Sequence, residues 1–221
     1  MNNQQLQEQI DQGGNPLTDA IIAGDFVRAR AIAAVGQVGE SDDMGRSPLY
    51  HLARHGGEQH VELARILLNN GANVNQEDDQ GDTPLHVAIF NRNLEMAMLL
   101  LRHGADPERW PDTDETYPVL FTLMMRRYHG RDMQRRQAAL AIAIHRRYGY
   151  AHGMDHDIWP LLLAASEGGN PVIVQWLLNQ GANPNVETIE GDRPLEAARL
   201  RGNTRIANML IAAGAVERQV N

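Results

Sequence analysis

The sequence contains no cysteine and no lysine, and each absence removes a kind of chemistry. Without cysteine the chain forms no disulfide and offers no thiol nucleophile or thiolate ligand. All 20 basic residues are therefore arginine. The missing lysine has two interpretations, which the sequence leaves open. It reflects codon usage in a GC-rich, bacterial genome, or selection against lysine modification in a bacterial protein that acts inside a host cell.

Long hydrophobic runs are also absent. The longest uninterrupted apolar run is Ala138–Ile144, far shorter than the roughly 20 residues that a membrane-spanning helix needs. The first fifteen residues, MNNQQLQEQIDQGGN, lack the charged and then apolar pattern of a secretion signal. We therefore expect a cytoplasmic protein with no membrane contact, although secretion without a cleaved signal stays open. Alternating β-branched runs are few, which favours an all-α fold.

One helix–turn–helix unit recurs along the chain, and its clearest copy is Gly81–Trp110. Thr83-Pro84 suits a helix start, Asn91–Asn93 interrupts the apolar pattern, and Gly104 suits a helix end. Two landmarks repeat with this unit. The prolines that open first helices are Pro16, Pro48, Pro84, Pro118, Pro160 and Pro194; the glycines that end second helices are Gly36, Gly71, Gly104, Gly149, Gly181 and Gly214.

The sequences TPLH at Thr83–His86 and LLRHGAD at Leu100–Asp106 resemble the ankyrin repeat. The resemblance implies an all-α solenoid of helix-turn-helix units with short hairpin-like loops, in which each unit buries its apolar face against its neighbours. We predict a polar segment at 1–14 and a single array at 15–221. Its units would span 15–43, 44–79, 80–113, 114–156, 157–190 and 191–221, with the fourth degenerate and expanded.

Charge is concentrated in the predicted fourth unit. Tyr117–Gly149 holds seven of the 20 arginines and one of the 28 acidic residues, which leaves 13 arginines and 27 acids elsewhere. One interpretation is two solvated faces that keep the protein soluble. The other is a bipolar docking surface that orients a complementary partner and speeds association.

Signatures of catalysis are missing from the sequence: we find no phosphate-binding glycine loop, no nucleophile elbow and no HExxH. His51 and His55 have a spacing that can bind zinc, but they begin a repeat, where polar side chains brace loops. His152, Asp155 and His156 lie in the connection 149–159. A metal-dependent enzyme that uses this connection is the alternative to our expectation of no enzyme, no metal and no cofactor.

Tyrosines occur among the arginines of the fourth unit, and such surfaces can stack nucleic-acid bases. The net charge of −8 disfavours nucleic acid as a partner, because phosphates would be repelled outside this one unit. We therefore expect a protein partner, and a monomer when the chain is free.

The resemblance implies protein binding through loop tips and the first helices. We expect contacts in units three to five, from the ends of first helices, from the basic unit and from aromatic or acidic loop tips. These residues are Phe90, Asn91, Trp110, Asp112, Asp114, Tyr117, Met124, Met125, Arg126, Arg127, Tyr150 and Trp159. The alternative is that Tyr117, Trp159 and the two methionines fill gaps left by lost TPLH motifs. The expected function is a non-catalytic inhibitor or immunity-type protein that neutralises or regulates one partner, or else an effector that binds a host protein.

Overall fold

The protein is represented by a computed structural model, which describes residues 15–109, 119–148 and 161–217. Within these ranges the chain forms twelve helices and no strands, so the predicted all-α class is confirmed. The chain divides into two compact units, Met1–Val119 and Leu120–Asn221. Among the described helices, none combines the length and the apolar composition needed to cross a membrane.

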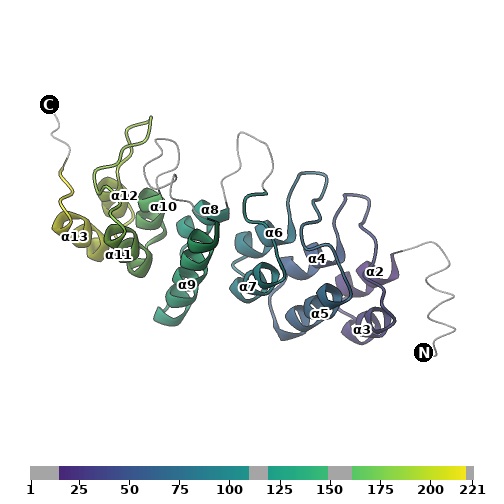
Figure 1. The fold of residues 1–221 in the computed structure, drawn as a ribbon. Helices are drawn as coiled ribbons and strands as arrows, with labels where there is room; N and C mark the ends of the chain where they lie inside the picture. The colour runs from purple at the N-terminus through teal and green to yellow at the C-terminus, as the bar shows by residue number, and fades with distance from the viewer. Residues whose placement is uncertain (1–14, 110–118, 149–160, 218–221) are drawn as a thin grey trace. The chain divides into compact units, whose positions relative to one another are not determined.

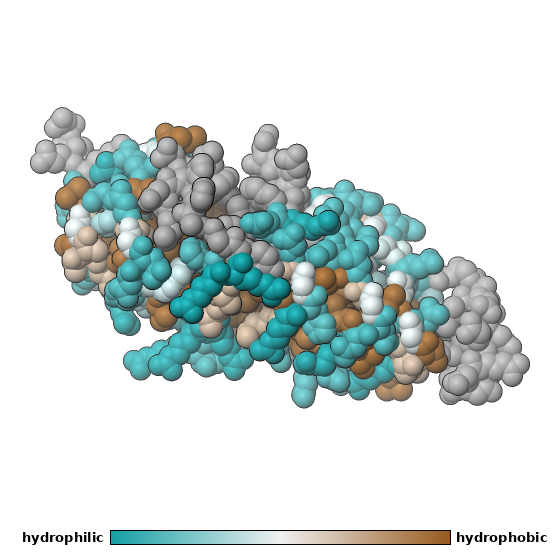
Figure 2. Space-filling model, viewed as in Figure 1, coloured by the Kyte–Doolittle hydropathy of each residue, from teal (hydrophilic) through white to brown (hydrophobic). Residues whose placement is uncertain are grey.

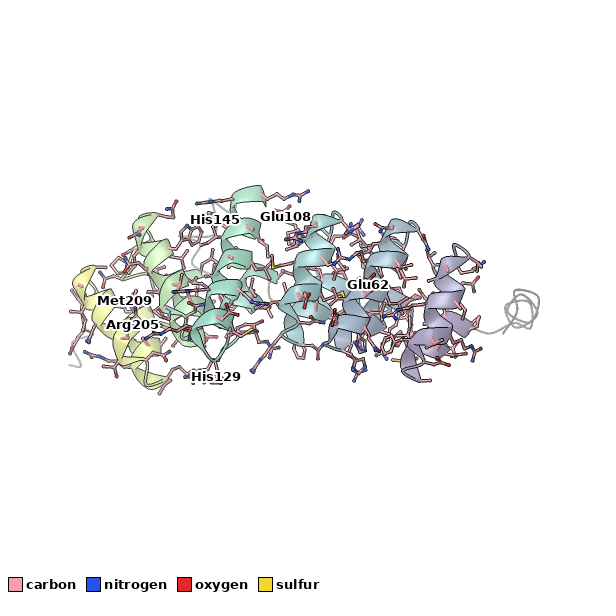
Figure 3. The ribbon with its side chains drawn as sticks, turned by 90° about the horizontal axis from the view of Figure 1, so that it is seen from below. Glu62, Glu108, His129, His145, Arg205 and Met209 are labelled. Carbon is pink, nitrogen blue, oxygen red and sulfur yellow. The ribbon has the colours of Figure 1, made fainter. Side chains whose placement is uncertain are left out.

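The first unit contains three helix pairs. They are α2 (Pro16–Ile22) with α3 (Phe26–Ala34), α4 (Pro48–Arg54) with α5 (Glu58–Asn69), and α6 (Pro84–Phe90) with α7 (Leu94–Arg102). The first helices α2, α4 and α6 pack side by side, and the second helices α3, α5 and α7 form a parallel row beside them (Figures 1 and 3). Loops from α3 to α4 and from α5 to α6 extend to one side of both rows (Figure 1).

The second unit repeats this arrangement with one enlarged member. Its helices are α8 (Val119–Met125), α9 (Arg131–Tyr148), α10 (Leu161–Gly168), α11 (Pro171–Asn179), α12 (Pro194–Leu200) and α13 (Thr204–Ala212). Helix α9 has 18 residues, whereas α11 and α13 have nine each. The second helices α9, α11 and α13 again stand in one row (Figure 3).

Proline and capping residues set the starts of these helices. Pro84 occupies the first turn of α6, where its missing N–H costs nothing, and the Thr83 side chain accepts from the backbone of His86. The His86 ring accepts from the Thr83 N–H at 3.2 Å, which completes a reciprocal capping box. The Ser47 hydroxyl caps α4 by accepting from the Tyr50 N–H, so Pro48 and Pro84 both mark true helix starts.

The core of each unit lies between its two rows of helices. Small residues occupy equivalent positions of the second helices, and Ala29, Ala64 and Ala97 are fully buried. Leucines from the first helices, such as Leu49 and Leu85, fill the space between the rows. Because alanine lets the helices approach closely, each repeat buries its apolar face against the next one.

Asparagine side chains link consecutive repeats. Asn70 donates to the Ala33 carbonyl at 2.6 Å, Asn93 to the His55 carbonyl at 2.8 Å, and Asn203 to the Ser166 carbonyl at 2.8 Å. Asn75 accepts from the Asp106 N–H, also at 2.8 Å. These bonds satisfy backbone groups that the ends of short helices leave unpaired. They make each unit a braced frame for the side chains on its surface.

Candidate protein-binding surface

The contact residues that the sequence predicts fall into three groups, and the members of the first are exposed or half-buried. Phe90 ends α6 with 63% of its surface accessible, and Asn91 is exposed beside it. The Asn91 side chain donates to the Val87 carbonyl at 2.8 Å, which fixes the end of the helix. Arg127 is also exposed, whereas Met125 and Arg126 are half-buried.

Met124 belongs to the second group, because the structure contradicts its predicted position on the surface. Its side chain is fully buried. Gly168, at the end of α10, packs so closely that a Cβ added there would lie 1.9 Å from the Met124 carbonyl oxygen. The expectation of an exposed Met124 is therefore wrong, because the following repeat covers this end of α8.

The third group lies outside the described residues. It comprises Trp110, Asp112, Asp114, Tyr117, Tyr150 and Trp159 as contact residues, together with His152, Asp155 and His156. Their roles stay predictions.

The first unit carries an exposed surface along the turns that join each first helix to its second helix. We name it the turn edge and define it as Ile22, Phe26, Arg54, His55, His60 and Phe90. Ile22, Arg54 and Phe90 each lie six residues after the proline that opens their helix. Ile22 is 62% accessible, and Arg54 and Phe90 are exposed in the neighbouring repeats. Figure 2 shows hydrophobic residues interspersed among hydrophilic ones over the helices of this unit.

Three rings make up the middle of the turn edge. Phe26 meets His60 edge to face, with centroids 4.7 Å apart, and His60 stacks at a tilt on His55 at 5.7 Å. The Asp25 side chain accepts from the Arg28 N–H at 3.0 Å and thereby starts α3 at Phe26. Gly57, with φ of 124°, makes the turn that brings His60 back toward His55.

The turn edge is braced by a neighbouring repeat, and Arg54 is its one permanently charged side chain. Asn93 fixes its middle by donating to the His55 carbonyl. Burial lowers the pKa of His60, and the nearby charge of His55 lowers it further, so both causes favour the neutral ring. The surface therefore offers aromatic and aliphatic side chains with one permanent charge, that of Arg54. Aromatic residues and arginine dominate the residues that carry binding energy in protein interfaces.

His51 has a structural role that differs from the zinc pairing considered for it. Its Nε2 atom lies 3.0 Å from the Asp42 carboxylate at the base of a loop. Burial lowers the pKa of His51, although the Asp42 carboxylate opposes this shift. The ring of His55 stacks instead on His60. Over residues 15–109, 119–148 and 161–217, no three His, Asp or Glu residues gather where a metal ion could be held.

Ile22, Phe26 and His60 were not among the predicted contact residues. Ile22 could have been found, because counting six residues from each proline leads to it as well as to Phe90. Phe26 and His60 come from different repeats, and their contact depends on how two turns pack together. No spacing in the sequence gives that contact.

Comparisons with known proteins agree with the repeat architecture. The family description "Ankyrin repeats (3 copies)" matches residues 17–109, and "Ankyrin repeat" matches residues 156–189. Human Rabankyrin-5 is 28% identical over 214 residues, which cover 95% of this chain but only 17% of Rabankyrin-5. The putative ankyrin repeat protein YahD of Escherichia coli K12 is 28% identical over 198 residues, covering 87% of this chain and 92% of YahD.

A solved structure shares the fold. It contains a predatory endopeptidase of Bdellovibrio bacteriovorus in complex with an immunity protein. The matching chain has a TM-score of 0.69 and 19% sequence identity, with 91% of this chain and 99% of that chain covered. At this level of identity the likeness concerns the fold alone.

Proposed function

We propose, from the premise that this chain belongs to the ankyrin-repeat family, that it is a non-catalytic protein-binding module whose turn edge contacts a partner protein. Ankyrin repeats mediate binding between proteins, and the stacked frame supports this use because binding requires little additional ordering. The observation that carries the proposal is Phe90, a large aromatic side chain held 63% accessible at the end of a braced helix.

The neighbours of Phe90 add to this argument. Ile22 places a second exposed apolar side chain at the same position two repeats earlier, and Arg54 lies at that position in the repeat between. A solvated helix end favours polar residues, so two large apolar ones in one row indicate a surface meant to be covered. The Phe26 and His60 rings, which meet edge to face, extend the surface with aromatic side chains.

We further propose that the partner is an enzyme or toxin that the chain neutralises by occupying its surface, as an inhibitor or immunity-type protein. A rigid aromatic surface suits such binding, because an inhibitor must remain bound and needs a slow dissociation rate. An effector that binds a host protein is the second candidate, and the absence of lysine favours it.

The test uses the partner obtained by affinity purification with the full chain, followed by calorimetric titration. Replacing Phe90 by alanine should weaken binding by about 30-fold, corresponding to a hot spot of about 2 kcal/mol. Leu200→Ala is the matched control, because Leu200 ends α12 at the same repeat position and is 87% accessible. Its affinity should stay within about twofold of the wild type, since it lies outside the turn edge.

Circular dichroism must show both variants folded. Equal affinities of wild type and Phe90→Ala would then exclude the turn edge as the contact surface. If the partner is an enzyme, its activity should fall to zero at one equivalent of the wild-type chain, and unchanged activity would exclude the inhibitor function.

A further inference from the structure

The outward side of α9 carries an unusual set of side chains. Arg131, Arg135 and Arg146 are exposed, and none makes a hydrogen bond or ion pair within the described part of the chain. No other described helix has more than one exposed arginine in this condition. Elsewhere arginines commonly meet carboxylates, as Arg109 meets Glu77 at 3.1 Å and Arg201 meets Glu167 at 3.3 Å.

The arginines flank a stretch of small side chains. Arg135 and Arg146 are eleven residues apart, which is three turns and about 16 Å along a helix, so both point to the same side. Ala139 and Ala143 lie between them on that side, and both are exposed. We name Arg131, Arg135, Ala139, Ala143 and Arg146 the arginine face. It has positive charge at each end, and its middle carries the methyl groups of Ala139 and Ala143 beside the half-buried Ile142.

The opposite side of α9 fixes the arginine face in place. Gln137 is fully buried and donates to the Leu123 carbonyl at 2.6 Å, while Asn170 donates to the Gln137 side chain at 2.8 Å. Toward the C-terminal end, the His145 ring meets Trp176 edge to face, with centroids 4.8 Å apart. Figure 3 labels His129, just before α9, and His145 near the end of the helix.

We propose that the arginine face docks an acidic α-helical segment of a partner protein. Helices whose contact residues are small approach to about 8 Å between axes, so alanines in the middle admit the backbone of a second helix. Carboxylates about eleven residues apart on that helix would meet Arg135 and Arg146 at the same time, because both helices rise equally per residue. Arginine pairs with carboxylates through two parallel hydrogen bonds, which sets the register.

Charge complementarity favours an acidic helix over nucleic acid. A nucleic acid carries a charge at every phosphate, and the 27 acidic residues outside Tyr117–Gly149 would repel most of them. An acidic helix places charge only at its two ends, where the arginines are. Ala139 and Ala143 also give bases nothing to stack on. The proposal concerns a surface other than the turn edge and shares with the proposed function only a protein partner.

The test measures binding of a fluorescent 20-residue helical peptide with two glutamate pairs eleven residues apart and alanines between them. Wild-type full-length chain should bind it at low salt. Arg135→Gln with Arg146→Gln should weaken binding at least about tenfold, since charge pairs across an interface are lost. The matched control is Arg102→Gln with Arg205→Gln, which removes the same charge from exposed positions on α7 and α13 and should change affinity less than about twofold.

A second variant separates docking from simple attraction. Ala139→Trp with Ala143→Trp keeps every charge but blocks close approach, and should weaken binding at least about fivefold because helix packing depends on contact. Unchanged binding by this variant, or no binding by the wild type, would overturn the proposal. An equal loss of peptide binding in the control variant would also overturn it. The same holds if a 20-nucleotide single strand binds more tightly than the peptide, or if the chain self-associates and Arg135→Gln with Arg146→Gln abolishes that self-association.

Failure here and failure of the proposed function are distinguishable. Phe90→Ala should leave peptide binding unchanged, because Phe90 is not part of the arginine face. Loss of the natural partner through Phe90→Ala would likewise leave the peptide result unaffected.

Discussion

Phe90 and Met124 occupy the same repeat position, six residues after a helix-opening proline, yet one is 63% accessible and the other is fully buried. Met124 is covered by the following repeat of its own compact unit. Gly168 lets that repeat approach the Met124 carbonyl, and Ser166, at the same repeat position in α10, is also buried. Position within a repeat therefore does not determine whether a side chain can contact a partner.

His86 supplies a prediction at the scale of one ring. Its Nδ1 atom accepts from the Thr83 N–H, and its Nε2 atom is buried without a hydrogen-bond partner in the described residues. Burial lowers the pKa of His86 to about 4, although Asp78 opposes the shift. Because this folded pKa is below the unfolded value of about 6.5, the stabilisation is complete above pH 6.5 and is lost as pH falls toward 4.

Replacing His86 by glutamine should flatten this dependence. Glutamine can accept the same Thr83 N–H but does not titrate, so the capping box remains. Urea unfolding at pH 7.5, 6 and 5 gives the free energy of unfolding at each pH. For the variant this free energy should change with pH less steeply than for wild type, by up to about 1.4 kcal/mol per pH unit, the value for one proton. Parallel slopes for the two proteins would show that His86 is not the group responsible.

Helix α9 shows how far an element can be predicted from the sequence. The spacing of apolar residues in the fourth unit predicts a long second helix at about Met133–Tyr148, and the helix in the structure spans Arg131–Tyr148. The prediction succeeds because the apolar spacing repeats over several turns. The burial of Gln137 at 0% accessibility was not predicted, because its partners on α8 and Asn170 are distant in the sequence.

Gly168 offers a test of packing between elements. Alanine at this position would place Cβ 1.9 Å from the Met124 carbonyl oxygen, and a backbone atom cannot move away cheaply. We expect Gly168→Ala to lower the free energy of unfolding by about 2–3 kcal/mol, as overpacking does. Thermal and urea unfolding measure this change.

The control for this substitution is Gly56→Ala. A Cβ added at Gly56 meets no atom within 4 Å, so its stability should stay within about 0.5 kcal/mol of wild type. If both variants were equally stable, α10 would not pack against the end of α8 as described.

The candidate site was predictable only where it follows from a single repeat. Phe90 and Asn91 were identified because they end a regular helix that the TPLH motif starts. The ring cluster of Phe26, His55 and His60 was not predicted, because two turns from different repeats must pack together before these rings meet. The residues that start and end a repeat can be recognised within that repeat. A surface that spans several repeats depends on how the repeats pack together, which the sequence does not show directly.

At the scale of the whole molecule, charge is divided more sharply than the net value of −8 suggests. Tyr117–Gly149 has seven arginines and one acid, whereas the remainder has 13 arginines and 27 acids. The field of the band at 117–149 decays within about 10 Å at 0.1 M salt, so it acts on a partner only at close range. At low salt the band instead attracts acidic surfaces over a longer distance and raises the association rate.

Reversing two charges of this band should therefore slow association with an acidic partner at low salt. Arg127 and Arg131 are exposed, so Arg127→Glu with Arg131→Glu should leave the fold intact. Stopped-flow association rates at 20 mM salt should fall about tenfold or more, and the difference should shrink at 0.5 M salt because screening removes the steering.

The corresponding reversal of Arg102 and Arg205 changes the net charge equally but lies outside the band. If the reversal of Arg102 and Arg205 slows association as much as the reversal of Arg127 and Arg131, the net charge of the protein, and not the position of the charges, controls the association rate. If neither pair has an effect at low salt, the band serves solubility alone. If only the reversal of Arg127 and Arg131 slows association, the basic repeat orients the partner. The acidic remainder of the chain then repels acidic parts of the partner, so that attraction and repulsion together favour one orientation.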